Sequence, residues 1–461
     1  MLSHLVADAS DAIPLTVATS EDLARSRLPF EERDRRWLGA IGYKADPGTF
    51  ALLPGAAGAL GRVLVGGTSA EAIWSLAGLP EGLPEGVYRL DPEPDAPIAS
   101  RLALGWALAC YAFARYKAPK RGFAKLVWPE KADRGWVERL SRGITLARDL
   151  INTPAEAMGP AELAGAVEAL AAQMKARCRV IVGDALLAEN YPMIHAVGRA
   201  SVRAPRLADL VWGDENAPKV TLVGKGVCFD SGGLDLKSAG PMRLMKKDMG
   251  GAATVLGLAS AIMEAGMPVR LRVLIPAVEN FVSANSFRPL DVLPTRKGIT
   301  VEIGNTDAEG RLILGDALVE ADREKPALLV DMATLTGAAR TALGPELPAL
   351  FSNDESLAAD LLREGEAALD PMWRLPLWQP YRKLLASNVA DINNASESPF
   401  AGAITAALYL QEFVAKETPW AHIDTYAWNA ASRPGRPEGG EALGLRALYG
   451  LIERRFGART A

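Results

Sequence analysis

Apolar and polar positions change along the chain between the periods typical of helices and of strands. Short apolar or β-rich runs predict strands at 62–66, 219–223, 269–276, 299–303, 327–332 and 422–424. Helical patterns, or long stretches of small and apolar residues, predict helices at 99–116, 136–150, 161–175, 251–265, 312–323, 404–414 and from Leu445 onward. The helix at 251–265 is apolar nearly all round, so it should be buried. Strands that alternate with helices are typical of a mostly parallel sheet covered on both faces, which predicts an α/β fold.

Composition divides the chain near residue 130. The segment 117–133 is basic and contains prolines, as a linker between domains often does. We predict a small N-terminal α/β domain over 1–130 and a larger C-terminal domain over 131–461, with a mostly parallel central sheet flanked by helices. The segment 131–152 is predicted to be a linker helix. It should end before Pro154, because a proline disfavours helical backbone at the preceding residue.

Charge and cysteine content argue against nucleic-acid-binding, membrane-binding and disulfide-stabilised secreted proteins. Lys and Arg number 51 against 55 Asp and Glu, for a net charge of −4. Nucleic-acid and anionic-membrane partners usually need a basic excess, so we expect neither. Three cysteines are too few, and odd in number, for a disulfide framework, which favours a reducing compartment. We see neither a secretory signal nor an apolar stretch of roughly 18 residues that could cross a bilayer, so we predict a soluble cytoplasmic protein.

The segment 305–312 carries Asp307, Glu309 and Arg311 at every second position. We predict an extended backbone here, in which alternate side chains point to one side of the chain. Two carboxylates held together repel, and the pKa of each rises unless a cation lies between them, so a divalent metal ion is a natural counter-charge. The alternative is a solvated charged turn, which is the commoner explanation of an isolated Asp-x-Glu pair.

A second charged segment, 223–251, favours the metal site. It contributes Asp230 and Asp248, each beside a glycine-rich stretch where backbone can approach an ion closely. Four carboxylates balance two divalent ions, and oxygen ligands suit Mg, Mn or Zn. Lys225 lies in the same segment and can bind a metal only as a neutral amine, which nearby cations favour by lowering its pKa. The alternative for Lys225 is a surface lysine in a loop.

These two segments resemble the signature segments of the leucyl aminopeptidase family. The matching positions of the family motifs are Lys225, Asp230, Lys237, Asp248, Asp307, Glu309 and Arg311. Similarity in 152–160, 331–337, 401–407 and 433–440 extends the resemblance over roughly two thirds of the chain.

The resemblance implies a metal-dependent aminopeptidase with a catalytic C-terminal domain and a leucine-like preference. It implies two divalent ions per subunit, Zn or Mn, held by Lys225, Asp230, Asp248, Asp307 and Glu309. In this assignment Asp230 and Glu309 bridge the two ions, Lys237 points at the scissile carbonyl, and Arg311 holds a bicarbonate ion that acts as general base.

The resemblance also implies the substrate contacts and the partners. Met245, Thr334 and Gly337 line the pocket for the first side chain, and Thr334 and Leu335 supply backbone contacts. The substrate is a peptide with a free N-terminus, and the protein forms a homo-oligomer, by resemblance a hexamer.

Some residues near the motifs have no family role. Cys228 lies two residues before Asp230, where a thiolate can be a soft ligand, but the family places a non-ligand there and we predict a packed thiol. We predict that Asp235 is solvated or bonded to backbone. The dipeptide Lys246-Lys247 differs from the residues that are most common at these two positions in the family. This difference affects the expected shape of the substrate pocket. The isolated His4, His195 and His422 are predicted to be structural or surface residues.

Two other functions remain as alternatives. The first is another two-metal hydrolase, such as a phosphoesterase; Lys225 within the ligand set and the lack of histidine ligands argue against it. The second is a regulatory or DNA-binding protein that keeps the fold without catalysis. The presence of all seven charged motif positions and the net negative charge argue against that alternative.

Overall fold

The computed structural model describes residues 2–25, 28, 30–55, 58–67, 73–119 and 122–457. Contacts divide the chain into two compact units: Met1–Thr145 with Ala431–Glu438, and Leu146–Ala430 with Gly439–Ala461. The division falls at residue 145, inside helix α5 (Arg134–Asn152), rather than near 130. A segment from the C-terminal part, Ala431–Glu438, also belongs to the first unit, which no single boundary along the sequence can express.

The first unit is an α/β domain built on one sheet. In its described residues the sheet has six strands in the order β1-β6-β5-β2-β4-β3, and only the β3–β4 pair is antiparallel. The strands are β1 (Leu5–Val6), β2 (Ile13–Ala18), β3 (Phe50–Pro54), β4 (Leu60–Gly66), β5 (Val87–Leu90) and β6 (Lys125–Val127). The helices assigned there are α1 (Ser20–Ala24), α2 (Glu32–Ala40), α3 (Leu79–Gly82) and α4 (Ala96–Ala109).

Helix α4 is shorter than the predicted 99–116. It begins three residues earlier and ends at Ala109, so the predicted C-terminal end is wrong. The apolar pattern continues beyond this end because Tyr111 is buried and Phe113 packs against Tyr116, with ring centroids 6.0 Å apart. These residues are buried or paired without being helical, and periodicity alone does not distinguish the two cases.

The second unit contains the larger sheet, with strand order β16-β15-β18-β14-β9-β11-β8-β7 and with β10 paired to β11. Its strands are β7 (Arg177–Val182), β8 (Arg206–Trp212), β9 (Lys219–Gly224), β10 (Gly226–Asp230), β11 (Arg270–Asn280), β14 (Leu328–Ala333), β15 (Ala349–Ser352), β16 (Trp373–Arg374) and β18 (Trp420–Asp424). The four central strands β18, β14, β9 and β11 are mutually parallel, and antiparallel pairs lie toward the edges. The mostly parallel central sheet is thus confirmed.

Smaller sheets lie outside the central one. The strand predicted at 299–303 is β13 (Thr300–Glu302), which pairs with β12 (Val292–Pro294) and β17 (Ile392–Asn393). The remaining pair is β19 (Trp428–Asn429) with β20 (Gly439–Gly440).

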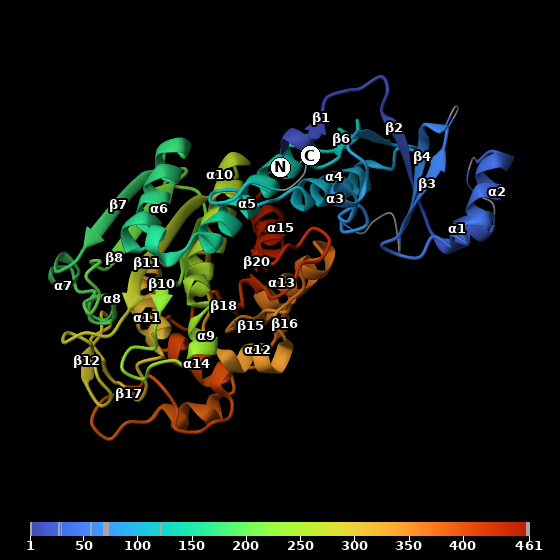
Figure 1. The fold of residues 1–461 in the computed structure, drawn as a ribbon. Coiled ribbons are helices and arrows are strands. Elements are labelled where there is room, and N and C mark those ends of the chain that lie inside the picture. Colours follow the sequence, from blue (N-terminus) through green and yellow to red (C-terminus); the bar gives the residue numbers. More distant parts are fainter. Residues whose placement is uncertain are drawn as a thin grey trace. The chain divides into compact units, whose positions relative to one another are not determined.

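Two groups of helices flank the central sheet (Figure 1). One group contains α6 (Pro160–Met174), α10 (Gly250–Glu264), α13 (Glu355–Ala367) and α15 (Leu445–Phe456). The other contains α8 (Pro192–Gly198), α11 (Glu309–Asp322) and α14 (Gly402–Gln411). Short helices are α7 (Ala185–Ala188), α9 (Ala239–Met242) and α12 (Gly337–Leu343). Every residue of α10 except the last is buried, as its apolar sequence predicted.

The parallel strands bring candidate residues to one edge of the sheet. Lys225 follows the last residue of β9, Thr334 follows β14, and Asp424 ends β18. Loops at the carboxyl ends of parallel strands are where sites form in such sheets. Close packing is needed here: a Cβ on Gly251, at the start of α10, would overlap the carbonyl oxygen of Met332 in β14. Among the described residues, no helix has both the length and the apolar composition needed to cross a membrane.

Candidate metal centre

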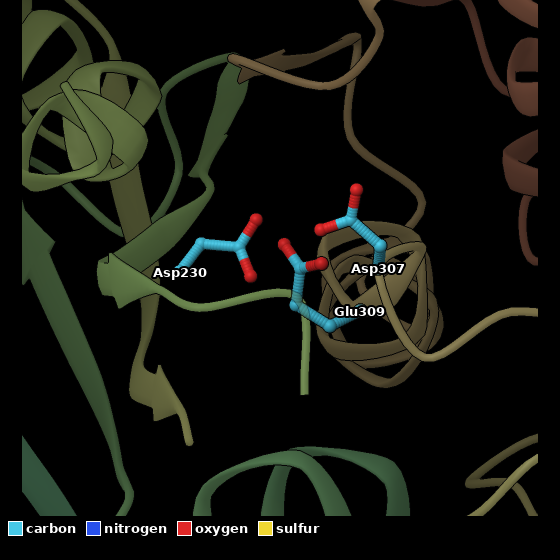
Figure 2. Close-up of side chains that lie close together, drawn as sticks. All are labelled: Asp230, Asp307 and Glu309. Carbon is cyan, nitrogen blue, oxygen red and sulfur yellow. The ribbon is translucent and has the colours of Figure 1, made fainter. Parts of the chain in front are cut away.

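Three carboxylates converge beside the end of β10. Asp230 is the last residue of that strand, Asp307 lies in the turn before α11, and Glu309 is the first residue of α11. Figure 2 shows that the three side chains point toward one another. One oxygen atom from each lies within 4.8 Å of the others, as in a group that can hold a metal ion.

The prediction of an extended backbone over 305–312 is wrong. Residues Thr306 and Asp307 form a turn, and Glu309 and Arg311 lie in the first turn of α11. The unpaired N–H groups at the start of a helix carry a partial positive charge, which favours acidic residues there. The carboxylates of Asp307 and Glu309 are therefore compatible with a helix start as well as with an extended segment. The Asp307 and Glu309 carboxylates still lie close together, because the turn directs the Asp307 side chain toward the side chain of Glu309 at the start of α11.

Two lysines complete the charged cluster. The Nζ atom of Lys225 lies 2.7 Å from Asp248 Oδ2 and 2.9 Å from Glu309 Oε1. It also donates a hydrogen bond of 3.0 Å to the carbonyl oxygen of Thr334. The Lys225 side chain is only 3% exposed, so the alternative of a surface lysine is wrong.

Lys237 pairs with the other carboxylates of the cluster. Its Nζ atom lies 2.7 Å from Asp230 Oδ2 and also forms an ion pair with Asp307. Its side chain is less deeply buried than that of Lys225. The ammonium group of Lys237 therefore lies between the carboxylates and the more open part of the site.

The pKa values show an excess of negative charge. Burial, and next the charge of Asp230, raise the pKa of both Asp307 and Glu309. Burial acts to lower the pKa of Lys225 and Lys237, but the surrounding carboxylates outweigh it and raise both values. Four carboxylates against two ammonium groups give the cluster an affinity for further cations.

Buried carboxylate oxygens indicate where cations can bind. Glu309 Oε1 and Oε2, Asp248 Oδ2 and Asp307 Oδ1 are buried carboxylate oxygens. A lysine Nζ atom contacts Glu309 Oε1, Asp248 Oδ2 and Asp307 Oδ1, but Glu309 Oε2 has neither a hydrogen-bond donor nor an ion pair within the described chain. A buried carboxylate oxygen without a donor is costly, and a divalent ion satisfies it. The donor set, four carboxylates and one amine, therefore fits a pair of hard or borderline divalent ions.

Surrounding residues hold Asp230 and the turn in place. Asn280, the last residue of β11, donates 2.9 Å and 3.1 Å hydrogen bonds to Asp230 Oδ1 and to the carbonyl oxygen of Thr306. Asp235 Oδ2 accepts hydrogen bonds from Thr306 N at 2.7 Å and from its hydroxyl at 3.1 Å. Asp235 is therefore the backbone-bonded carboxylate that was predicted, and it ties the two signature segments together.

A second support fixes the loop after β14. Thr334 donates its hydroxyl to Asp248 Oδ1 at 2.7 Å. Asp424 Oδ1 accepts hydrogen bonds from Leu335 N at 2.9 Å and Thr336 N at 3.3 Å. Asp424 was not predicted as a site residue, because its position at the end of β18 becomes informative only once β18 is seen beside β14.

A cavity of about 420 Å³ opens onto the cluster. Its lining includes the four predicted substrate residues Met245, Thr334, Leu335 and Gly337. It also includes five residues of the charged cluster: Lys225, Asp230, Lys237, Asp248 and Asp307. The structure thus brings ten of the eleven predicted site residues together, counting Glu309 through its contacts in the cluster. The lining also includes Lys247, Arg340 and Tyr426, which were not predicted as site residues. Of these three, only Lys247 had a signal in the sequence, the unusual Lys246-Lys247 dipeptide.

Arg311 is the exception. It is buried, and its Nη1 donates a 2.7 Å hydrogen bond to the carbonyl oxygen of Asn394, while its Nε has no acceptor in the described chain. It does not line the cavity in the described residues. Burial lowers the pKa of Arg311. Its role in holding bicarbonate stays a prediction.

The residues predicted to lack a site role do lie outside the cluster. Cys228 is fully buried, and burial raises the pKa of its thiol well above the usual value, so it is a packed thiol. His422 is fully buried and pairs through Nδ1 with Asp331 Oδ1 at 2.6 Å. His195 Nε2 lies 3.1 Å from Asp184 Oδ1, and the ring of His4 meets that of Phe123 edge-on at 5.4 Å.

Sequence comparison identifies the family. Residues 145–449 match the catalytic domain of the cytosol aminopeptidase family, and residues 13–129 match the N-terminal domain of M17 aminopeptidases. The chain belongs to the cytosol aminopeptidase family. A probable cytosol aminopeptidase of Syntrophotalea carbinolica is 42% identical over 371 residues, 77% of this chain and 74% of that protein. A probable cytosol aminopeptidase of Roseiflexus castenholzii is 40% identical over 369 residues, 76% of this chain and 75% of that protein.

Solved structures similar to this chain have the same fold. The cytosol aminopeptidase of Coxiella burnetii is 49% identical, with a TM-score of 0.95 over 98% of this chain and 100% of that chain. The bottromycin maturation enzyme BotP, in complex with Mn, is 34% identical, with a TM-score of 0.87 over 97% and 100% of the two chains. Family membership supports a peptidase that acts at N-termini, and it confirms the resemblance drawn from the signature segments.

Proposed function

We propose that this protein is a metal-dependent aminopeptidase that hydrolyses the first peptide bond of peptides with a free N-terminus. The observation that carries the proposal is the cluster of four carboxylates and two lysines at one end of a cavity, in which a buried oxygen of Glu309 has no donor within the described residues. Family membership supports the same reaction class.

The carboxylates and Lys225 would hold the metal ions. Asp230, Asp248, Asp307 and Glu309 would supply carboxylate oxygens to the two ions, and Lys225 would supply its amine. Two divalent ions held in this way supply a water molecule activated at neutral pH and Lewis-acid stabilisation of negative charge.

The chain's own groups bind and orient the substrate. Lys237 extends its ammonium group toward the cavity, where it can donate a hydrogen bond to the scissile carbonyl oxygen as negative charge develops there. The backbone of Thr334 and Leu335, held by Asp248 and Asp424, offers fixed groups for the substrate backbone. Preorganised groups of this kind lower the barrier because they need no rearrangement during the reaction.

The finer assignments are part of the same proposal. We infer that the ions are Zn or Mn; the Mn complex of BotP favours a trial with Mn first. We infer a leucine-like preference, assembly into a homohexamer and a cytoplasmic location, as the resemblance implies. We also infer that Arg311 holds a bicarbonate ion, which requires activity to depend on added bicarbonate and an Arg311→Met variant to lose that dependence.

Release of p-nitroaniline from leucine-p-nitroanilide tests the proposed function. Mn- or Zn-loaded protein should cleave this substrate, while chelated protein should not. N-acetyl-leucine-p-nitroanilide should stay intact, because its amine is blocked. Bis-p-nitrophenyl phosphate tests the phosphoesterase alternative in the same assay. Hydrolysis of the phosphate ester alone, or of neither substrate by metal-loaded protein, would contradict the proposal.

A further inference from the structure

The cavity contains a second charged region, formed by Lys247, Arg340 and Tyr426. Lys247 lies on the short 3-10 helix Met245–Met249, and its Nζ atom is 4.5 Å from the centroid of the Tyr426 ring. Arg340, on α12, has its Cζ atom 5.0 Å from the same centroid, and its Nη1 donates a 3.3 Å hydrogen bond to the Tyr426 hydroxyl. All three residues line the cavity that reaches the carboxylate cluster.

These two cations differ from the lysines of the cluster, because neither is in direct contact with a carboxylate of the described chain. Within the described residues neither Lys247 nor Arg340 forms an ion pair, whereas Lys225 and Lys237 each pair with two carboxylates. Lys247 is also only 4% exposed, and its ammonium group has no hydrogen-bond acceptor in the described chain. Contact with the Tyr426 ring compensates only part of the lost hydration of a buried cation.

Two carboxylates of the lining, Asp248 and Asp424, act on Lys247 through their charge, but both have other partners. Asp248 pairs with Lys225 and accepts the Thr334 hydroxyl. Asp424 Oδ1 accepts the N–H groups of Leu335 and Thr336, and its Oδ2 accepts the Thr336 hydroxyl at 2.6 Å. Asp424 is thus occupied by the loop after β14. The Lys247 ammonium group therefore faces a cavity that can admit a further carboxylate.

The remaining lining relates this region to the substrate. Met245, on the same 3-10 helix as Lys247, and Gly337, at the start of the helix that carries Arg340, also line the cavity. Open space surrounds Gly337, since an added Cβ would meet no atom within 4 Å. A substrate whose first peptide bond lies at the carboxylate cluster can place its first side chain along this surface, toward Tyr426.

We propose that Lys247 and Arg340 form a subsite for a carboxylate, so that the enzyme accepts peptides that begin with glutamate or aspartate as well as those with apolar first residues. This inference rests on the proposed aminopeptidase function. A carboxylate in the subsite gains charge-assisted hydrogen bonds that the isosteric amide of glutamine forms more weakly. Tyr426 forms the aromatic wall between the two cations and contacts the apolar part of the side chain.

The ratio of kcat/KM for glutamate-p-nitroanilide to that for glutamine-p-nitroanilide tests the subsite. Anilides have no second residue, so a carboxylate can come only from the first side chain. We expect a ratio of about 10 in the wild-type protein, as one charge-assisted hydrogen bond provides. In Lys247→Met, a variant that keeps most of the length of the side chain, the glutamate-to-glutamine ratio should fall to about 1. In Arg340→Gln the same ratio should fall by a smaller factor.

Lys246→Met is the matched control. The Lys246 ammonium group donates a 2.6 Å hydrogen bond to the carbonyl oxygen of Asn152 and lies 5.5 Å from the centroid of the Trp428 ring. Lys246 is absent from the described lining of the cavity. Removing its charge should leave the glutamate-to-glutamine ratio at the wild-type value, which separates a local contact from a general effect of net charge.

Some outcomes overturn the inference. A wild-type ratio of 1 or less would do so, and so would a high ratio that survives in both Lys247→Met and Arg340→Gln. If Lys247→Met does not fold, the exposed Arg340→Gln decides. Calorimetric measurement of the affinities for free glutamate and free glutamine separates the subsite proposal from the proposed aminopeptidase function. If glutamate binds more tightly through Lys247 but no anilide is hydrolysed, only the aminopeptidase function is refuted. Equal binding of the two amino acids refutes the subsite.

Discussion

Replacing Gly310 with alanine should separate the stability of the protein from its activity. Gly310 is the second residue of α11, directly after Glu309. A Cβ atom there would lie 2.5 Å from Cε and 2.7 Å from Nζ of Lys225. Carbon atoms in contact are normally about 3.5–4.0 Å apart, so the end of the Lys225 side chain must withdraw by about 1 Å.

That withdrawal breaks specific contacts. The Lys225 ammonium group is held at 2.7 Å, 2.9 Å and 3.0 Å by Asp248, Glu309 and Thr334, and about 1 Å more takes at least one of these contacts out of hydrogen-bond range. A displacement of this size in a catalytic site costs about 10²-fold in rate. Alanine is at the same time the better helix former by about 0.5–1 kcal/mol, which offsets part of the strain in the folded state.

We therefore expect Gly310→Ala to retain a melting temperature near that of the wild-type protein while kcat/KM for leucine-p-nitroanilide falls about 10²-fold. Bound metal, measured by atomic emission, should fall with it. Gly165→Ala in α6 is the control, because its added Cβ meets no atom within 4 Å; it should raise stability and leave activity unchanged. Wild-type activity and metal content in Gly310→Ala would refute the argument that Lys225 must occupy its present position.

Three further predictions follow from the cluster and from the buried histidine. Lys237→Ala should lower kcat for leucine-p-nitroanilide by about 10²–10³-fold, as loss of one donor to a developing oxyanion does, and an unchanged kcat would remove that role. Asp307→Ala and Glu309→Ala should each reduce the metal bound per chain, measured after dialysis; full retention in both would exclude the site as described. Burial acts to lower the pKa of His422, but Asp331 outweighs it and the pKa is raised. The charged pair thus stabilises the fold fully below about pH 6.5, and this contribution is lost as the pH rises through the folded-state pKa. The difference in melting temperature between wild-type and His422→Gln should therefore shrink as the pH rises above about 6.5, and a constant difference would contradict a protonated His422.

The central strands could be predicted from the sequence because burial on both faces leaves a simple pattern. Residues 219–223 and 327–332 consist mostly of apolar residues, and both are parallel strands in the middle of the sheet. The edge strand β7 was missed because its arginines alternate with half-buried residues and resemble a solvated segment. Strand β11 was predicted to end at Pro276 but continues to Asn280, because Pro276 falls between its pairing with β9, up to Leu274, and its pairing with β10, from Ala277.

The site was predictable where chemistry is concentrated in short segments. The five predicted metal ligands come from two stretches, and the structure brings them together. The residues that were missed, Asn280, Arg340, Asp424 and Tyr426, come from three other segments and carry no local signal. Each gains its role from what the fold places beside it, which periodicity and spacing within one segment do not encode.

The return of Ala431–Glu438 to the first unit has a consequence for how the chain acquires its structure during synthesis. Gly435 and Arg436 pack on Trp74: a Cβ on Gly435 would lie 2.7 Å from the indole ring, and Arg436 Cζ lies 4.4 Å from the ring centroid. Residues 146–430 of the second unit precede this segment, so the first unit receives its last piece only after most of the second has been translated. A fragment that stops at residue 145 lacks this cover over Trp74. Separate expression of the first unit would therefore need the 431–438 segment supplied by a designed connection.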